Sequence, residues 1–272
     1  MRKKILIKFG GEIVENEKSL ENLALSLAKL FADGHQIILV HGGGPLATAL
    51  SKRLNIEPKM VGGRRVTCKE TLEVMKMTLP GIINSNILAM LKKHKLPAVA
   101  VSAISFINAS LRPPKRVSGS NNEVVDFGFV GDIKSVDPAL INFYLEKKLI
   151  PVISPLCADD KGNILNINAD TVATATAEAL EVDSLVMVTQ VGGIFEDIKN
   201  PSSKMTLLSM SEASKKIAEG IISGGMIPKV EECNKLFEKQ LSAVHIVGVN
   251  SPDDIANEIA HPGSVGTTIV KK

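Results

Sequence analysis

A run of glycines at the end of an apolar strand is the strongest chemical signal in this sequence. The strand that ends at His41 is followed by Gly42–Gly44, and Pro45 then opens a helical pattern. Glycines let a backbone approach a ligand closely, and a helix N-terminus offers N–H groups and a partial positive charge to an anion. The pattern therefore predicts an anion-binding turn. An ordinary tight turn between strand and helix is the alternative.

A lysine lies inside the aliphatic first strand. Lys8 follows Ile5–Ile7 and precedes Phe9 and a second glycine turn, Gly10 and Gly11. Burial of an unpaired ammonium is costly, so this side chain must reach a carboxylate or an anionic ligand. An edge-strand lysine in solvent is the alternative, and the aliphatic neighbours favour a central strand instead.

Two charged residues elsewhere stand at predicted helix starts. Asp170 follows Asn166–Ala169 and opens an Ala-rich helix, where an acidic residue is usually a favourable cap. Lys229 follows a glycine pair, where a solvated surface charge is the ordinary interpretation. Neither residue is informative alone. Taken with Lys8, they supply a carboxylate and two cations at turns that favour anions.

The glycine run also allows a nucleotide-binding alternative. Gly42, Gly44 and Ala47 fit the dinucleotide pattern G-x-G-x-x-G/A. The pattern follows the second strand rather than the first, and about 20 residues later the chain has Gly62–Arg65 where an acidic ribose ligand is expected. An NADP enzyme that uses one of the two arginines stays open. A Walker phosphate loop is excluded, because the chain has no Gly-Lys dipeptide.

The elements that position these residues follow from the pattern of the whole chain. Short aliphatic runs alternate with longer helical patterns, which indicates a mostly parallel sheet between helices. The predicted strands are 4–9, 36–40, 98–102, 149–154, 184–189, 243–247 and 267–270. The predicted helices start near 19, 45 and 138 or cover 68–95, 170–181, 210–220, 229–240 and 252–260. Pro80 predicts a kink or a break in the third helix, and the segment 103–135 is predicted to form β-hairpins.

Composition excludes several classes of protein. The 272 residues are 44% hydrophobic and carry a formal net charge of +3, which indicates a globular chain rather than a disordered one. Only 3% are aromatic, so few platforms exist for stacking bases and nucleic acid is an unfavoured partner. Three scattered cysteines predict thiols in a reducing cytoplasm, and no apolar run is long enough to predict a membrane span.

Several motifs, taken in order along the whole chain, carry a family resemblance. They are Lys8-Phe9-Gly10-Gly11, Val40-His41-Gly42-Gly43-Gly44-Pro45, Gly63-Arg64-Arg65-Val66-Thr67, Val125-Asp126-Phe127-Gly128-Phe129-Val130-Gly131, Asn166-Ile167-Asn168-Ala169-Asp170, Gly225-Met226-Ile227-Pro228-Lys229 and Gly266-Thr267. The chain resembles the amino-acid kinase family, and within it the acetylglutamate kinases. The resemblance implies an α/β fold, a three-layer αβα sandwich with a central mostly parallel sheet. It also implies one domain over 1–272, with an amino-acid lobe over about 1–168 and a nucleotide lobe over about 169–272.

The resemblance further implies transfer of the ATP γ-phosphoryl group to the side-chain carboxylate of N-acetyl-L-glutamate, in arginine biosynthesis. Mg²⁺ is then held largely by the phosphates and water, with no protein ligand assigned. By this resemblance, Lys8 and Lys229 stabilise the transferring phosphoryl group, and Asp170 holds the two lysines in place. The amino acid is bound by Gly43, Gly44, Arg65 and Asn166. The nucleotide is bound by Gly10, Gly11, Thr189, Gly192 and Gly193. Two alternatives remain: a related kinase of the aminoadipate type, and a non-catalytic ligand-binding member of the fold.

Three departures from the family pattern lead to further expectations. Gln190 stands where relatives carry aspartate, so contacts on the nucleotide side are expected to differ there. The loop 102–106 lacks the usual glycines and acid, so it is expected to pack differently. The chain begins almost at its first strand, without the helix that arginine-inhibited hexameric relatives use. We therefore expect a cytoplasmic homodimer that arginine does not inhibit strongly, with no membrane partner.

Overall fold

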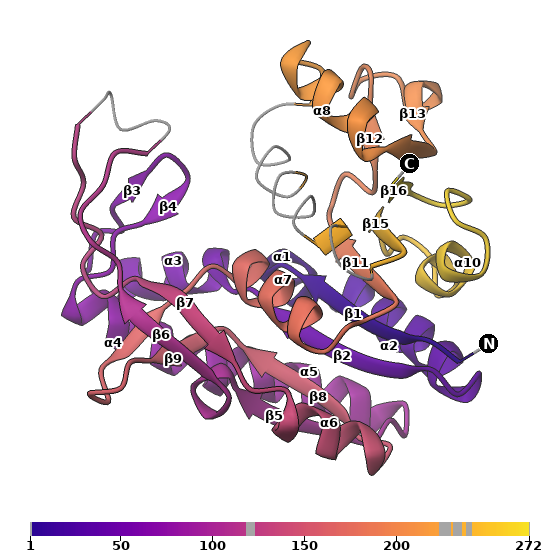
Figure 1. Cartoon of the computed structure of the whole chain (residues 1–272). Coiled ribbons are helices and arrows are strands. Elements are labelled where there is room, and N and C mark those ends of the chain that lie inside the picture. The colour runs from indigo at the N-terminus through magenta and orange to yellow at the C-terminus, as the bar shows by residue number, and fades with distance from the viewer. Residues whose placement is uncertain (1, 118–122, 223–229, 231–235, 238–240, 272) are drawn as a thin grey trace.

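An eight-stranded, mostly parallel sheet forms the centre of the molecule (Figure 1). A computed structural model describes residues 2–117, 123–222, 230, 236–237 and 241–271. Across the sheet the strands are β14 (Leu207–Ser209), β16 (Thr267–Val270), β15 (Ala243–Val247), β11 (Ser184–Val188), β1 (Lys4–Phe9), β2 (Gln36–His41), β8 (Ile150–Ser154) and β5 (Ala98–Ser102). Neighbouring strands are parallel except β15 and β16. The predicted parallel sheet is confirmed, with β1 among its central strands.

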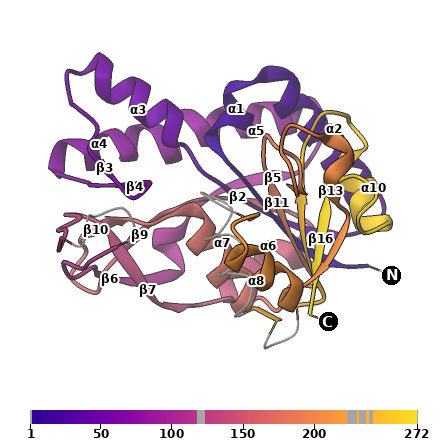
Figure 2. The same cartoon turned by 90° about the horizontal axis from the view of Figure 1, so that it is seen from above.

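Helices cover both faces of this sheet, which confirms the three-layer arrangement (Figures 1 and 2). One face packs on α2 (Glu17–Ala32), α5 (Asn84–Lys93) and α10 (Asp254–Ala260). The other packs on α6 (Ala139–Glu146), α7 (Ala169–Ala179) and α8 (Met210–Ala218). Each face has its own buried apolar cluster.

The two clusters divide the side chains of β1 between them. Ile5, Ile7 and Phe9 belong to the cluster beneath α2, whereas Leu6 belongs to the cluster beneath α7. Because successive side chains of a strand point to opposite faces, Lys8 lies on the same face as Leu6. The strand thus directs its lysine toward α7.

The long helical pattern over 68–95 forms three consecutive pieces. They are α4 (Lys69–Met77), a π-helical segment (Thr78–Ile83) and α5. Proline has no N–H to donate, and the interruption predicted at Pro80 is present as a break, in which a π-helical segment separates the two α-helices. Within the described chain, the stretch Lys69–Lys93 contains a segment that is long and apolar enough to cross a membrane by length and composition alone. Because α5 packs on β5 and β8, this stretch behaves as a core helix.

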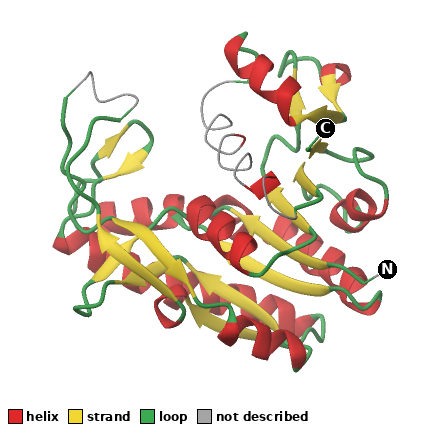
Figure 3. Ribbon diagram, viewed as in Figure 1, coloured by secondary structure: helices red, strands yellow, loops and turns green. Residues whose placement is uncertain are grey.

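A second sheet projects from the end of the main one (Figure 3). Its order is β10 (Ile164–Asn166), β9 (Leu156–Ala158), β6 (Ile107–Leu111) and β7 (Gly131–Val136). The antiparallel pair β6 and β7 confirms the hairpin predicted within 103–135. β9 and β10 were not predicted.

Short elements complete the described chain. The hairpins are β3 (Met60–Val61) with β4 (Arg64–Arg65) and β12 (Ile194–Phe195) with β13 (Lys204–Met205). The remaining helices are α1 (Gly11–Glu15), α3 (Gly44–Arg53) and the 3₁₀ turns Ala103–Ser105 and Pro201–Ser203. The helix predicted over 229–240 falls mostly outside the described residues.

Candidate active site

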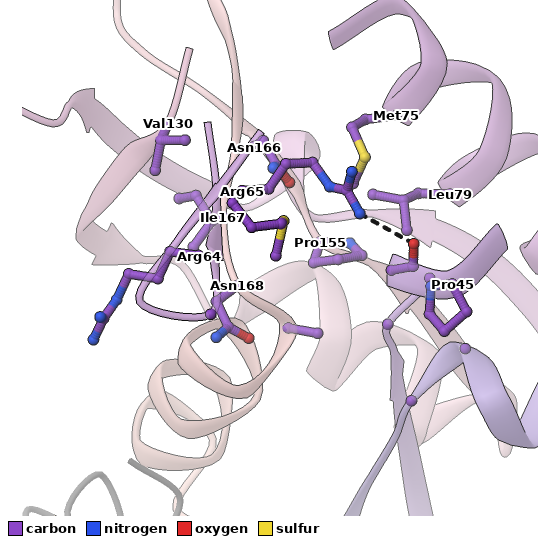
Figure 4. Close-up of a pocket in the computed structure, with 18 of the residues that line it drawn as sticks. Pro45, Arg64, Arg65, Met75, Leu79, Val130, Pro155, Asn166, Ile167 and Asn168 are labelled. Atoms are coloured by element: carbon purple, nitrogen blue, oxygen red, sulfur yellow. Dashed lines mark hydrogen bonds between the residues drawn. The ribbon is translucent and has the colours of Figure 1, made fainter. Parts of the chain in front are cut away.

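A cavity of about 330 Å³ opens where the carboxyl ends of β1 and β2 meet the second sheet (Figure 4). Seven predicted site residues line it: Lys8, Gly10, Gly11, Gly43, Gly44, Arg65 and Asn166. Carboxyl ends of parallel strands are the usual place for ligands in open α/β sheets. The glycine turns and the first lysine are therefore brought together as expected.

The Lys8 ammonium reaches a carboxylate, as the strand pattern predicted. Its Nζ lies 2.7 Å from Asp170 Oδ1, and the two side chains are only 10% and 14% exposed. Asp170 is held at the start of α7, where the Asn168 side chain accepts a hydrogen bond of 2.9 Å from the Asp170 N–H. The pair places a fixed cation at the floor of the cavity, next to Gly10 and Gly11.

The two glycine turns touch each other, and this contact explains why they are glycines. Gly42 N–H donates to Phe9 O at 2.8 Å, and a Cβ at Gly11 would lie 2.9 Å from Gly43 Cα. A Cβ at Gly43 would also clash with Leu79 of the π-helical segment. A side chain at Gly11 would force the two turns apart, whereas one at Gly43 would displace side chains of the π-helical segment.

Gly44 differs, because a Cβ there would meet nothing within 4 Å. It begins α3, whose N-cap Gly43 supplies no side-chain hydrogen bond. The first N–H groups of a helix have no intrahelical partner. The turn therefore offers backbone donors to an anion in the cavity.

His41 supports this turn from below, a role that sequence reasoning missed. The ring is fully buried, and burial lowers its pKa to about 4, so the imidazole is neutral at pH 7. Nδ1 lies 3.1 Å from Gly42 O and Nε2 lies 3.4 Å from Asn84 Nδ2. Only a neutral ring with its proton on Nδ1 donates to the first and accepts from the second. A histidine at the end of a buried strand was the available signal.

Arg65 spans the cavity toward the glycine turn (Figure 4). Its Nη2 donates to Gly44 O at 3.1 Å and to Thr48 Oγ1 at 2.8 Å. Its Nη1 is buried without a hydrogen-bond partner among the described residues, and burial lowers the pKa of this guanidinium. Desolvation of an arginine with free donors is costly unless an anion meets it. Asn166, beside Arg65, donates to Thr67 Oγ1 at 3.1 Å.

Three charged residues of the cavity wall were given no role in the predicted kinase site: Glu12, Arg64 and Arg112. Arg64 was, however, a candidate in the NADP alternative. A Cβ at Gly10 would clash with the Glu12 carboxylate, so this carboxylate lies over the first glycine turn. Arg112 follows β6 and pairs with Asp132 at 2.6 Å. The position of Glu12 directly after the turn was a usable signal. Nothing local marked Arg112.

Three of the residues expected on the nucleotide side, Thr189, Gly192 and Gly193, lie apart from this cavity, whereas Gly10 and Gly11 line it. Thr189 follows β11, and its Oγ1 accepts from the Gly192 N–H at 3.1 Å. Gly192 has φ of 74°, a conformation that favours glycine, and a Cβ at Gly193 would crowd Lys204 and Thr267. These residues do not line the cavity, although β11 pairs with β1 beside it. Lys229 lies outside the described residues.

The donor set limits how a metal ion could bind. Within the described ranges, no group of three His, Cys, Asp or Glu side chains could hold a metal. Among the residues that line the cavity, Glu12 carries the carboxylate. The carboxylate of Asp170 is engaged by Lys8. One carboxylate suits Mg²⁺ that is bound mainly by phosphate and water, since Mg²⁺ often uses few protein ligands.

Two of the positions at which the sequence departs from the family pattern lie outside the cavity. The loop 102–106 forms a 3₁₀ turn in which the Ser102 hydroxyl accepts from the Ile104 N–H, and none of its residues lines the cavity. Gln190 is exposed after β11.

Comparison with known proteins agrees with this architecture. Residues 3–248 match the model of the amino acid kinase family. Acetylglutamate kinase of Anaeromyxobacter dehalogenans (strain 2CP-C) is 41% identical over 98% of this chain and 99% of that protein. Acetylglutamate kinase of Methanococcus maripaludis (strain C7) is 40% identical over 99% of this chain and 92% of that protein.

A solved structure has the same fold. N-acetylglutamate synthase from Neisseria gonorrhoeae, in complex with coenzyme A and N-acetyl-glutamate, superposes with a TM-score of 0.84 at 24% identity. The match covers all of this chain and 60% of that one. By its motifs, its fold and these relatives, the chain belongs to the amino acid kinase family.

Proposed function

We propose that this chain is an acetylglutamate kinase, which transfers the γ-phosphoryl group of ATP to the side-chain carboxylate of N-acetyl-L-glutamate. The names of relatives about 40% identical over nearly full length support the reaction. The observation that carries it is the Lys8 and Asp170 pair between two glycine turns, facing an arginine whose Nη1 has no partner among the described residues. This is a site for a small dianion next to a phosphoryl group.

The reaction needs positioning and charge neutralisation rather than a base. A carboxylate is ionised at neutral pH, so one of its oxygens can attack the γ-phosphorus directly while the bond to the bridging oxygen breaks and ADP leaves. Lys8 stabilises the negative charge on the transferring phosphoryl oxygens. Asp170 holds the ammonium in place and takes no proton. Lys229 is proposed to act from the opposite side.

The amino-acid substrate is proposed to bind between the glycine turn and Arg65. Nη1 of Arg65 pairs with the α-carboxylate, Asn166 binds it further, and the N–H groups at Gly43 and Gly44 receive the side-chain carboxylate. Arg65 is already anchored on Gly44 O and Thr48, so its fork is preorganised. This arrangement would hold the acceptor oxygen near Lys8.

The nucleotide is proposed to lie over the C-terminal lobe, with its phosphates at Gly10 and Gly11 and its other contacts near Thr189, Gly192 and Gly193. Mg²⁺, when bound, neutralises phosphate charge and orients the polyphosphate. Glu12, over the first glycine turn, could supply one oxygen ligand to it.

Acyl phosphate formation tests the proposal. The purified protein is incubated with MgATP, hydroxylamine and one of four acceptors: N-acetyl-L-glutamate, L-glutamate, L-aspartate or L-2-aminoadipate. Hydroxamate should form fastest with N-acetyl-L-glutamate. Preference for aminoadipate would favour the related kinase, and absence of ADP with every acceptor would reduce the chain to a ligand-binding member of the fold.

The proposed enzyme acts as a cytoplasmic homodimer. β5 ends the main sheet as its edge strand within the described chain, and Phe143 on the neighbouring α6 is 52% exposed. An open strand edge carries unpaired backbone groups that can pair with a second chain. Light scattering after size exclusion should give twice the chain mass of 29.1 kDa.

A further inference from the structure

Arg112 is fixed at the wall of the cavity by the second sheet. Its Nε and Nη2 donate to Asp132 Oδ1 at 2.8 and 2.6 Å, and Nη2 also lies 3.4 Å from Gly131 O. The side chain is only 14% exposed. Because two nitrogens of this guanidinium are already hydrogen-bonded, the side chain has few accessible rotamers before any ligand binds. Its remaining donors are therefore preorganised.

Those remaining donors belong to Nη1, for which the described residues provide no hydrogen bond. Arg112 lines the same cavity as Asn166 and Val130. The Arg112 N–H donates to Val130 O at 2.8 Å, and Val130 forms a parallel bridge with Asn166. Because adjacent strands lie about 4.8 Å apart, Arg112 and Asn166 flank Val130 at about 10 Å from each other. One small acyl group could lie between them.

Cationic side chains outnumber acidic ones in the lining of the cavity. Lys8, Arg64, Arg65 and Arg112 line the cavity, whereas Glu12 is the acidic residue that lines it. Lys8 pairs with Asp170 and Arg112 pairs with Asp132, which leaves the guanidinium groups of Arg64 and Arg65 without an acidic partner among the described residues. An α-ammonium group would be repelled by them, while an acylated nitrogen is neutral and presents a carbonyl oxygen that accepts hydrogen bonds.

We propose that Arg112 is a specificity-determining residue, whose Nη1 donates to the carbonyl oxygen of the substrate's N-acyl group. Together with Arg64 and Arg65 it also disfavours substrates with a free α-ammonium. This inference rests on the proposed function and assigns the recognition of the acyl group to a residue outside the family motifs. Sites built to bond a polar group reject analogues that lack it, because their donors are then left unpaired.

Three acceptors separate the two effects at saturating MgATP. N-acetyl-L-glutamate carries the acyl carbonyl, glutarate carries no nitrogen substituent, and L-glutamate carries the ammonium. In Arg112→Met, kcat/KM for N-acetyl-L-glutamate should fall about 10- to 100-fold, as for loss of a charge-assisted hydrogen bond. The value for glutarate should stay within about twofold, and that for L-glutamate should rise relative to glutarate.

Two further variants separate charge from geometry. Arg112→Lys keeps the cation but cannot bond Asp132 with two nitrogens, so it should keep the rejection of L-glutamate and lose preference for N-acetyl-L-glutamate. Arg116→Met removes an exposed arginine of the same segment that does not line the cavity. This control variant should leave kcat/KM for all three acceptors unchanged.

The ratio of N-acetyl-L-glutamate to glutarate is the deciding quantity. An equal loss with both acceptors, or an unchanged ratio in Arg112→Met, would overturn the proposal, since a structural role would impair both alike. If the wild-type protein phosphorylates no acceptor, the proposed function fails instead. Calorimetric binding of N-acetyl-L-glutamate and glutarate to wild type and Arg112→Met then still decides the role of Arg112.

Discussion

At the scale of single residues, the fixed cation is the feature on which phosphoryl transfer depends most. Lys8→Ala should lower kcat by about 100-fold or more, because it removes a stabiliser of charge that develops in the transition state. The KM for N-acetyl-L-glutamate should change much less, since Arg65 and the glycine turn are the groups proposed to bind the ground-state carboxylates. Steady-state kinetics with a coupled ADP assay measure both values.

Lys4 provides the matched control, because it lies on the same strand and its Nζ donates to Leu180 O at the far end of the sheet. Lys4→Ala should keep the wild-type kcat. A Lys8→Ala enzyme that retained more than a tenth of kcat would contradict the assigned role.

Glu12 leads to a prediction about the metal ion. Glu12→Gln keeps the shape of the side chain but removes the carboxylate charge above the first glycine turn. Affinity for MgATP should fall several-fold, whereas affinity for metal-free ATP should stay the same or rise, because repulsion from the polyphosphate is lost. Isothermal calorimetry with and without Mg²⁺ measures both affinities.

The exposed Glu15, on the same short helix, gives the control variant Glu15→Gln, which should bind both forms of ATP as the wild type does. Equal weakening of MgATP and metal-free ATP by Glu12→Gln would show that the carboxylate only supports the turn.

Local patterns in the sequence predicted some site residues and missed others for a physical reason. Lys8 stood out because an ammonium in an aliphatic strand needs a partner, and the structure supplies Asp170. Arg112 has no such signal. It reaches the cavity only because β6 pairs with β7 and Val130 bridges to Asn166, and such pairing between distant segments is not encoded in any short window.

At the scale of elements, the end of β2 and the turn after it form one unit with the ring of His41. Its pKa is lowered to about 4 by burial, while an exposed histidine titrates near 6.5. Between about pH 6.5 and about pH 4 the histidine is protonated in the unfolded chain but neutral in the folded one. The free energy of unfolding therefore falls as the pH decreases from about 6.5 to about 4. The expected loss is about 3 kcal/mol.

Urea unfolding at several pH values in this window measures the effect, and His41→Gln serves as the comparison. The variant starts less stable, but the dependence of its unfolding free energy on pH should be shallower by that amount. His35 also has a pKa lowered by burial, and its contribution remains in both proteins. Identical pH slopes in the two proteins would refute the neutral ring.

The elements themselves were predicted unevenly. Aliphatic strands such as Lys4–Phe9 and Ala243–Val247 were found at their observed bounds, because buried parallel strands are continuous apolar runs. The three-residue strands Leu156–Ala158 and Ile164–Asn166 were missed, since too few residues alternate to give a period. The interruption at Pro80 was located correctly, but its π-helical form was not predicted.

At the scale of the whole molecule, one sheet joins the two lobes. β1 of the predicted amino-acid lobe pairs with β11 of the predicted nucleotide lobe from Ile5 with Ser184 to Phe9 with Val188. Both buried clusters also cross this boundary, because each contains residues of β1 and of β11. Neither lobe can open without exposing apolar surface of the other, so the lobes should lack independent stability.

The chain should accordingly unfold in a single cooperative transition. Tyr144 is the only tyrosine and no tryptophan is present, so tyrosine fluorescence reports on α6 in the first lobe, whereas far-UV circular dichroism reports on all elements. Urea curves from the two probes should coincide, as required of a two-state transition. Tyr144→Phe should abolish the fluorescence change and leave the dichroism midpoint nearly unmoved, which confirms the reporter.

Native-state hydrogen exchange should give similar opening free energies for the amides of β1 and β15, because both strands are buried in the same sheet. A fluorescence midpoint well separated from the dichroism midpoint would mean that the two lobes are independent folding units despite their shared sheet.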